Sequence, residues 1–326
     1  MHVTVIGAGP AGSSAALSAL REGAEVSIFE KSKFPRHKVC GEFLSPEAQA
    51  LLDELGIWRE CEACQPATLR RVFLSIGKHT KSWKLSEAAR GLSRYAMDHV
   101  LLQGAITRGA SFHREAATAA PGAVLAYGRQ SRGPAGNRLF GFKAHFQGPS
   151  DDVMSLFFFQ GSYVGVNAVE GGVTNVCGVA SEADLGRNGF RIDEYIQSCQ
   201  PLCERIQPLR RTMEWLTTGP LVFGVANQAE SCYAAGDSAA FVDPFTGSGM
   251  LGAISSGILA GRAAAHATLP EAHRKRWCAI IGGQQRSAQL LRTALDFGVA
   301  ERLLPFVPGR ALFYATRPSR ISVAYT

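Results

Sequence analysis

Three glycines near the N-terminus have the spacing of a turn that binds a dinucleotide. Gly7, Gly9 and Gly12 form a G-x-G-x-x-G pattern between the apolar run 3–6 and an alanine-rich segment. The first glycine permits the tight turn, the second lets the backbone approach a pyrophosphate, and the third allows a helix to pack closely. The N-terminus of that helix would then face the phosphates.

A carboxylate completes this unit. The second apolar run, residues 26–29, is followed by Glu30, which lies 18 residues after Gly12. A carboxylate at this strand end can accept hydrogen bonds from the ribose hydroxyls of adenosine. Two strands that flank a helix at 11–21, closed by Gly23, therefore predict a βαβ unit for the ADP portion of a dinucleotide. The unit alone does not distinguish FAD from NAD.

A second glycine-rich turn, in the last third of the chain, favours FAD. Gly236 and Asp237 follow a predicted strand at 232–235, and the segment DPFTGSGM, starting at residue 243, leads into a helix predicted at 250–267. Asp237 offers a carboxylate for a sugar-alcohol hydroxyl such as those of ribitol. The backbone-lined N-terminus of the helix suits an anionic reduced flavin.

The other elements predict a second lobe built on a sheet. Apolar, β-rich segments indicate an antiparallel sheet, at 71–76, 139–146, 153–159, 162–169 and 173–180. Further helices are predicted at 46–55, 97–108 and 271–298, and a short strand at 123–127. The expected domains are interleaved: an FAD-binding domain at 1–68, 93–135 and 223–270, a substrate sheet at 69–92 and 136–222, and a C-terminal helical region at 271–326.

The composition is that of a globular protein with a basic balance. The 326 residues are 46% hydrophobic and 19% charged, with a net charge of +7 and a pI near 9.1. This charge suits an anionic cofactor or an acidic substrate, and no nucleic-acid motif accompanies it. No apolar run reaches the ~20 residues of a spanning helix, so we expect no transmembrane segment, while peripheral membrane contact stays open. Eight scattered cysteines without a secretion signal predict reduced thiols in the cytoplasm and no metal site.

The second turn also carries a family resemblance. Its sequence GDSAAFVDPFTGSGM is similar to the G-D-A-A-G-F-x-x-P-x-T-G-x-G-I segment of geranylgeranyl-reductase-like flavoproteins. The chain as a whole resembles the FAD-dependent superfamily that contains p-hydroxybenzoate hydroxylase, geranylgeranyl reductases and flavin-dependent halogenases. The resemblance implies an α/β fold in which a Rossmann-like FAD-binding domain is interleaved with an antiparallel-sheet substrate domain.

The resemblance also implies roles for particular residues. Asp237 would bind the ribitol, and Arg94, in an R-x-x-x-D segment, would contact FAD, although a surface arginine is an equal alternative. The loop FPRHKVCGEFLSPEA would lie beside the flavin, with Cys40 as a candidate acid or polar contact and Arg36 and Lys38 near cofactor or substrate charge. Alternatively, Cys40 only packs. The expected cofactor-binding set is Gly7, Gly9, Pro10, Ala11, Gly12, Glu30, Lys31, Arg36, Cys40, Gly41, Arg94, Gly236, Asp237, Pro244, Gly247, Ser248, Gly249 and Met250.

Departures from the family pattern limit what can be said about the reaction. Residues 109–123 form only a short bridge where relatives carry a β-meander, and the W-x-W-x-I-P segment of halogenases and the Y-x-W-x-F-P segment of reductases are both absent. We expect an NAD(P)H-dependent monooxygenase that acts on a small or carrier-bound substrate. The alternatives are a geranylgeranyl-reductase-like C=C reductase, a non-catalytic flavin-binding maturation factor and a plain NAD-binding module.

Overall fold

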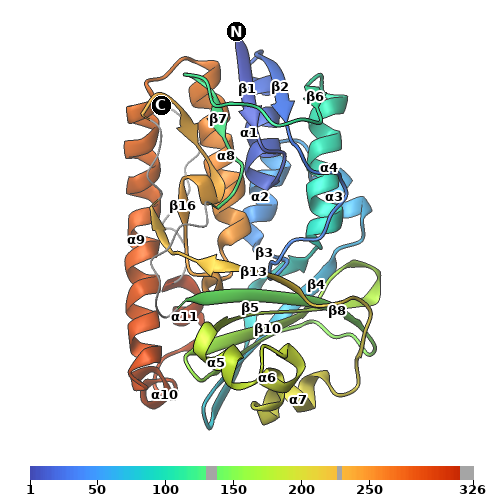
Figure 1. Cartoon of the computed structure of the whole chain (residues 1–326), viewed down its shortest axis with the longest axis vertical. Helices are drawn as coiled ribbons and strands as arrows, with labels where there is room; N and C mark the ends of the chain where they lie inside the picture. The colour runs from blue at the N-terminus through green and yellow to red at the C-terminus, as the bar shows by residue number, and fades with distance from the viewer. Residues whose placement is uncertain (130–137, 226–229, 316–326) are drawn as a thin grey trace.

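The computed structural model describes residues 1–129, 138–225 and 230–315. In Figure 1 a parallel sheet with its helices lies above a larger mixed sheet, and the long helix α9 (Pro270–Asp296) runs along one side of both. The strands of each sheet come from alternating stretches of the sequence. The chain therefore passes several times between the two layers.

The predicted βαβ unit is confirmed at the centre of the upper sheet. Helix α1 (Pro10–Arg21) connects β1 (His2–Ile6) to β2 (Glu25–Phe29), which pair in parallel. The sheet has the order β15-β7-β1-β2-β6 among the described residues, and all its pairings are parallel. Its other strands are β6 (Ser111–His113), β7 (Val124–Leu125) and β15 (Tyr233–Ala234), and its helices include α2 (Pro46–Glu54), α3 (Trp58–Ala63), α4 (Arg94–Thr107) and α8 (Gly249–Ala265).

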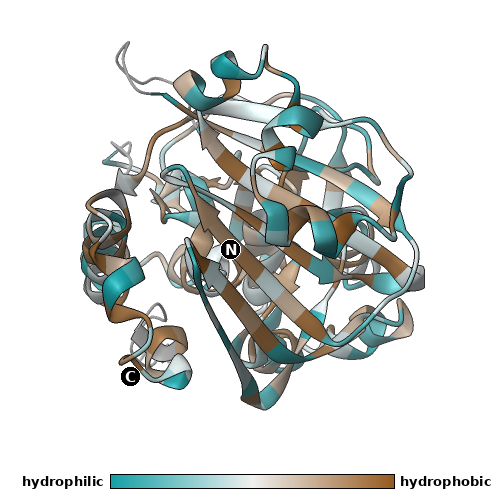
Figure 2. Cartoon of the chain, turned by 90° about the horizontal axis from the view of Figure 1, so that it is seen from below, coloured by the Kyte–Doolittle hydropathy of each residue, from teal (hydrophilic) through white to brown (hydrophobic). Residues whose placement is uncertain are grey.

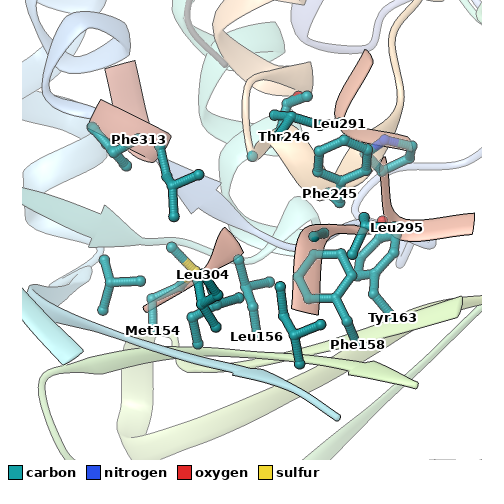
Figure 3. A pocket seen from close by; sticks show the side chains of 18 of the residues that line it. Met154, Leu156, Phe158, Tyr163, Phe245, Thr246, Leu291, Leu295, Leu304 and Phe313 are labelled. Atoms are coloured by element: carbon teal, nitrogen blue, oxygen red, sulfur yellow. The ribbon is translucent and has the colours of Figure 1, made fainter. Parts of the chain in front are cut away.

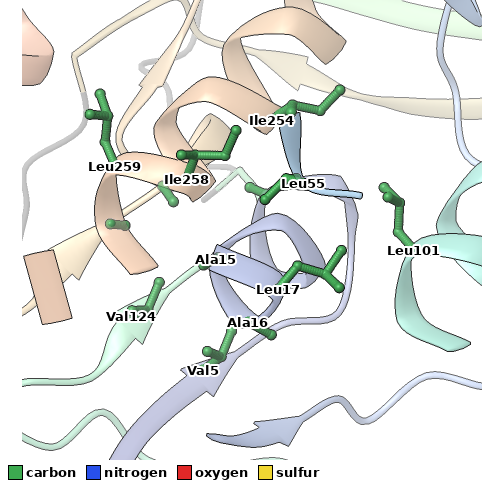
Figure 4. Close-up of a cluster of buried hydrophobic side chains, with 14 of the residues drawn as sticks. Val5, Ala15, Ala16, Leu17, Leu55, Leu101, Val124, Ile254, Ile258 and Leu259 are labelled. Carbon is green, nitrogen blue, oxygen red and sulfur yellow. The ribbon is translucent and has the colours of Figure 1, made fainter. Parts of the chain in front are cut away.

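Helices α1 and α8 are in near backbone contact. A Cβ atom on Gly257 would lie 2.3 Å from the carbonyl oxygen of Ala11, and one on Gly261 would lie 2.1 Å from that of Ala15. Figure 4 shows Ala15, Ile254 and Ile258 in the buried cluster at this crossing. Gly257 and Gly261 of α8 therefore permit the two helices to approach.

The lower sheet is mixed, which corrects the predicted antiparallel sheet. Its order is β12-β8-β11-β10-β9-β4-β5-β3, with β13 also paired to β8, and the β4–β9 pair is parallel. The chain between β4 and β9 passes through the upper layer, and such a long crossover allows a parallel pair. The strands are β3 (Phe43–Leu44), β4 (Ala67–Ile76), β5 (His79–Gly91), β8 (Leu139–Gln147), β9 (Val153–Phe159), β10 (Ser162–Ala168), β11 (Val173–Ser181), β12 (Arg210–Arg211) and β13 (Leu216–Leu221).

Helices flank the mixed sheet on two sides. Seen from below in Figure 2, α5 (Glu182–Arg187), α6 (Ile192–Gln197) and α7 (Gln200–Ile206) lie across its lower face. After α9, α10 (Val299–Leu303) and α11 (Gly309–Ala315) lie near β4 and β5. The remaining short elements are β14 (Gly224–Val225), β16 (Ala240–Phe241), η1 (Glu170–Gly172), η2 (Gly236–Ser238) and η3 (Pro244–Thr246). Among the helices of the described ranges, none combines the length and apolarity that crossing a membrane requires.

A buried ionic cluster fixes the loop after β2 to the mixed sheet. The Glu42 side chain is fully buried; its Oε1 accepts hydrogen bonds from Lys143 Nζ and, at 2.6 Å, from the backbone N–H of Arg94. Its Oε2 lies 2.7 Å from Nε2 of His145. Lys143 and His145 are both on β8, so the cluster joins the loop, the start of α4 and the sheet. Burial alone would raise the pKa of Glu42, but His145 and Lys143 lower it below its ordinary value.

The helix crossing gives a first prediction. Gly261→Ala should lower the free energy of unfolding by about 2 kcal/mol, because the new methyl group overlaps the Ala15 carbonyl. Gly282→Ala in α9, where a Cβ would meet nothing within 4 Å, is the matched control and should be neutral or slightly stabilising. Urea unfolding measures both, and equal stabilities would contradict the close contact.

The ionic cluster gives a second prediction, on pH. Glu42→Gln leaves Lys143 buried without its counter-charge and should cost about 3 kcal/mol at neutral pH. Because the folded pKa of Glu42 is depressed, its contribution is present above the unfolded pKa of about 4.3 and is lost as the pH falls through the folded value. The free energy of unfolding, measured across this pH range, should therefore change less with pH for Glu42→Gln than for the native chain.

The exposed pair Glu182–Arg138 supplies the comparison. Glu182→Gln should have a much smaller effect at neutral pH, since solvent screens this pair. If Glu42→Gln were as mild as Glu182→Gln, the cluster would not hold the loop in place.

Candidate active site

A cleft lies where the parallel strands end. Four of them, β1, β2, β7 and β15, are followed at their carboxyl ends by residues that line it, and ligands of open α/β sheets bind at this edge. Fourteen residues of the expected cofactor-binding set line this cleft: Gly9, Pro10, Ala11, Glu30, Arg36, Cys40, Gly41, Arg94, Gly236, Asp237, Pro244, Gly247, Gly249 and Met250.

Four members of the expected set lie outside the lining, three of them for structural reasons. Gly7 has a φ of +104°, and a Cβ there would lie 2.3 Å from the Ala126 carbonyl oxygen. A Cβ on Gly12 would lie 1.8 Å from the Gly7 carbonyl oxygen. Ser248 is buried, with its hydroxyl 2.6 Å from that of Thr246. These residues shape the two turns, whereas Lys31 is an exposed side chain.

Glu30 lines the cleft directly after β2, where the sequence predicted a carboxylate for the adenosine ribose. Its Oε1 accepts a hydrogen bond from the Ser32 backbone at 2.8 Å, and its Oε2 accepts one from Arg36 at 3.1 Å. Burial alone would raise the pKa of this carboxyl, but the Ser32 amide and the Arg36 charge bring it below its ordinary value. Glu30 is therefore an ionised acceptor at the end of β2.

The second turn approaches the first closely. Gly236 has a φ of +61°, and a Cβ on it would lie 2.8 Å from the Cβ of Ala11. Asp237 follows, with Oδ2 at 3.8 Å from Nε of Arg129. Neither α1 nor α8 has a side chain that caps its N-terminus. Both helix N-termini therefore present backbone N–H groups to one cleft, which suits a ligand with negative charge at two places.

An ion pair that the sequence did not reveal holds the turn before α8. Arg292, on α9, donates to Oδ2 of Asp243 from Nε at 2.7 Å and from Nη2 at 2.5 Å. Asp243 Oδ1 also accepts from the Phe245 backbone at 3.4 Å. Spacing could not suggest this pair, because the two residues are 49 positions apart on different elements. It fixes α9 to the segment that begins α8.

Arg94 lines the cleft and is not a surface arginine. Its side chain is 16% exposed, and its guanidinium donates to both carboxylate oxygens of the buried Asp98, at 2.6 and 2.7 Å. Asp98 outweighs the effect of burial and keeps the pKa of Arg94 above its ordinary value. The guanidinium of Arg94 therefore lies close to Gly9: a Cβ on that glycine would be 3.7 Å from Nη2 of Arg94.

Cys40 is a half-buried thiol of the cleft wall. Its sulfur accepts a hydrogen bond from the Glu42 backbone at 3.4 Å, and its carbonyl oxygen accepts one from Asn175 Nδ2 at 3.1 Å. Burial raises the pKa of this thiol, and Arg94 only partly opposes that effect. Cys40 therefore carries its proton at neutral pH, so it can donate one but is a poor nucleophile.

An apolar cavity opens from the far side of the cleft. Figure 3 shows Met154, Leu156 and Phe158, from β9, below Phe245 and Leu291. Strands β4 and β5 and helices α9 to α11 close its other sides. The further lining side chains are mostly aliphatic or aromatic: Val72, Leu74, Ile76, Trp83, Leu295, Leu303, Leu304, Val307, Leu312 and Phe313.

The cleft and the cavity share a wall. Six residues line both spaces: Gly41, Phe43, Tyr163, Cys177, Pro244 and Gly247. We call them the junction. Cys177 is buried, yet it lines both spaces. Tyr163 was missed because an alternating strand gives no sign of which side chains line a cavity, and burial raises its pKa well above the ordinary value.

The cleft residues fit FAD. Glu30 and Asp237 supply carboxylates at the ends of two different strands, and the uncapped helices α1 and α8 suit the pyrophosphate and the flavin, respectively. The glycines at positions 7 and 236 leave room where a side chain would collide with the neighbouring turn or helix. Within the described ranges, no cluster of His, Cys, Asp or Glu could hold a metal ion.

Comparisons with known proteins agree with this assignment. A family model described as FAD binding domain matches residues 1–122. A menaquinone reductase from Mycolicibacterium smegmatis is 51% identical over 55 residues, which are 17% of this chain and 13% of that protein. The sequence match thus spans a small part of that relative's length.

Solved structures resemble the whole chain. A flavoprotein/dehydrogenase from Cytophaga hutchinsonii aligns with a TM-score of 0.81 at 19% identity, over 97% of this chain and 91% of that one. A geranylgeranyl bacteriochlorophyll reductase-like protein from Thermoplasma acidophilum aligns at 0.71 with 18% identity, over 99% and 93%. Residues 1–122 therefore match an FAD binding domain, and the chain shares its overall fold with these two solved proteins.

Proposed function

We propose that this chain is an FAD-dependent oxidoreductase that reduces a carbon–carbon double bond in a hydrocarbon-rich substrate. The observation that carries the proposal is the apolar cavity, which meets the cofactor cleft at the junction. Its lining offers few polar groups, among them Asn167, Thr246 and Tyr163, so it suits a substrate that needs little hydrogen bonding.

The reaction divides between the cofactor and the protein. Reduced FAD supplies the hydride, and a nicotinamide nucleotide is the proposed donor that reduces it. In this proposal the N-terminus of α8 holds the flavin end of FAD, the walls of the apolar cavity exclude water, and the protein provides a proton. Cys40, a protonated thiol next to the junction residue Gly41, is the proposed proton donor.

Oxygen-dependent hydroxylation, the reaction first expected from the sequence, is the second candidate. It also needs an apolar, closed site next to the flavin, and the cavity provides one. The scarcity of polar groups in the cavity is what favours reduction, because a phenolic or acidic substrate would need partners there. If the substrate is attached to a carrier, only its free end would enter the cavity.

The direct test uses FAD-loaded protein reduced without oxygen and a detergent-dispersed lipid with a geranylgeranyl chain. Mass spectrometry should find product that has gained two hydrogen atoms per reduced bond. Cys40→Ala should retain FAD but lose most of this turnover, while Cys203→Ala, a half-buried thiol in α7, should not. Product that forms only in air and contains one added oxygen would establish hydroxylation instead. If neither reaction yields product, the chain binds FAD but lacks the proposed activity.

The cofactor assignment has its own prediction. Asp237→Ala should weaken FAD binding by about tenfold or more, because it removes a charged hydrogen-bond acceptor from the ribitol end. Asp152→Ala, on the surface beside Arg71, is the matched control and should bind FAD normally. Titration of the apoprotein followed by flavin fluorescence measures both affinities. Equal FAD affinities of the two variants would show that the ribitol does not bind at Asp237.

A further inference from the structure

A short surface segment at the lower end of α9 exposes large apolar side chains. Phe297 is 79% exposed, Val299 43%, Leu303 50% and Phe306 82%. We call these four residues the apolar ridge. All lie within or beside α10, at the end of the long helix in Figure 1. Exposed aromatic and aliphatic side chains gathered in one place mark an interaction surface.

The opposite side of the same segment forms a wall of the cavity. Ala300, Leu304 and Val307 line the cavity, and Leu304 is only 3% exposed. Leu303 belongs to both sides, since it lines the cavity and is half exposed. The ridge and the cavity are therefore separated by the thickness of one short helix.

Polar contacts hold this segment against the hairpin of β4 and β5. Lys81 Nζ donates to the carbonyl oxygens of Leu304 at 2.8 Å and Pro305 at 3.3 Å. Glu301 Oε1 accepts from the Lys78 backbone at 3.2 Å. These contacts use polar groups of the segment, while Phe297, Val299 and Phe306 stay exposed and Leu303 is half exposed at the cavity wall. The hydrogen bonds to the hairpin therefore fix the segment in place while the apolar ridge stays exposed.

The charge around the ridge is positive. Lys78, Arg302 and Arg310 are exposed beside it. Within the described residues 297–315, Glu301 is the one acid, against Arg302 and Arg310, and its carboxylate already accepts the Lys78 hydrogen bond. Aromatic and leucine side chains flanked by Lys and Arg are the combination that enters the headgroup region of anionic bilayers.

We propose that the apolar ridge docks this protein on the surface of an anionic lipid bilayer. Phe297 and Phe306 enter the boundary between headgroups and acyl chains, and the surrounding cations meet lipid phosphates. Docking places Leu303, and with it the cavity wall, at the lipid surface. A hydrocarbon substrate could then pass directly from the bilayer to the cavity, a step that rests on the proposed function, whereas docking itself does not.

Vesicle flotation with the FAD-loaded protein tests the docking. The native chain should float with vesicles of mixed phosphatidylcholine and phosphatidylglycerol, less with phosphatidylcholine alone, and less at high salt. The double variant Phe297→Ser/Phe306→Ser should lose at least about tenfold in affinity. Leu269→Ser is the matched control, because Leu269 is 73% exposed at the opposite end of α9, about 40 Å away.

Three results would overturn the proposal. These are a native chain that does not float, a double variant that floats as well as the native chain, and a ridge that binds a second copy of the chain. The last is seen if ultracentrifugation finds a native dimer that the double variant converts to a monomer. Thermal unfolding and bound flavin verify that each variant is folded. Turnover of a detergent-dispersed substrate should survive in the double variant, so a failure of docking is distinguishable from a failure of the proposed reaction.

Discussion

The site depends on the near contact between α1 and α8. Gly257 and Gly261 let α8 lie against the backbone of Ala11 and Ala15, at distances that no side chain would permit. The two helices begin at turns far apart in the sequence, yet this crossing brings both N-termini to one cleft. One helix alone would provide an anion site for a phosphate, and the pair provides positions for both ends of a dinucleotide cofactor.

A second constraint joins this cofactor cleft to the cavity. Glu42 ties the loop that carries Cys40 and Gly41 to Lys143 and His145 of the mixed sheet. The loop therefore belongs to both layers, and Gly41 lines both spaces. An isolated carboxylate would be costly at this depth, and the two basic partners and the Arg94 amide offset that cost. Because the two layers are interleaved in sequence, residues from both of them line the cleft.

The sequence carried information about the turns and little about the cavity. The positions of the turn glycines and of Asp237 at the cleft were predictable, because local backbone geometry and the place after a strand set them. Strand β5 was missed because its residues are mostly polar, with only Trp83 and Leu85 alternating on one face. The partners of Glu42 and the Asp243–Arg292 pair could not be inferred, since each joins segments that meet only in the folded chain. The apolar cavity escaped prediction for the same reason, as strands β4, β5 and β9 and the C-terminal helices each supply only part of its wall.

The proposed arrangement has one FAD spanning the cleft, with its ring at the junction between cleft and cavity. A crystal structure of the FAD-loaded protein would test this arrangement. We expect the adenosine ribose at Glu30, the ribitol at Asp237 and the ring beside Gly41, Cys177 and Gly247. A ring placed away from these residues, or a crystal that takes up NAD but no FAD under the same conditions, would rule the arrangement out.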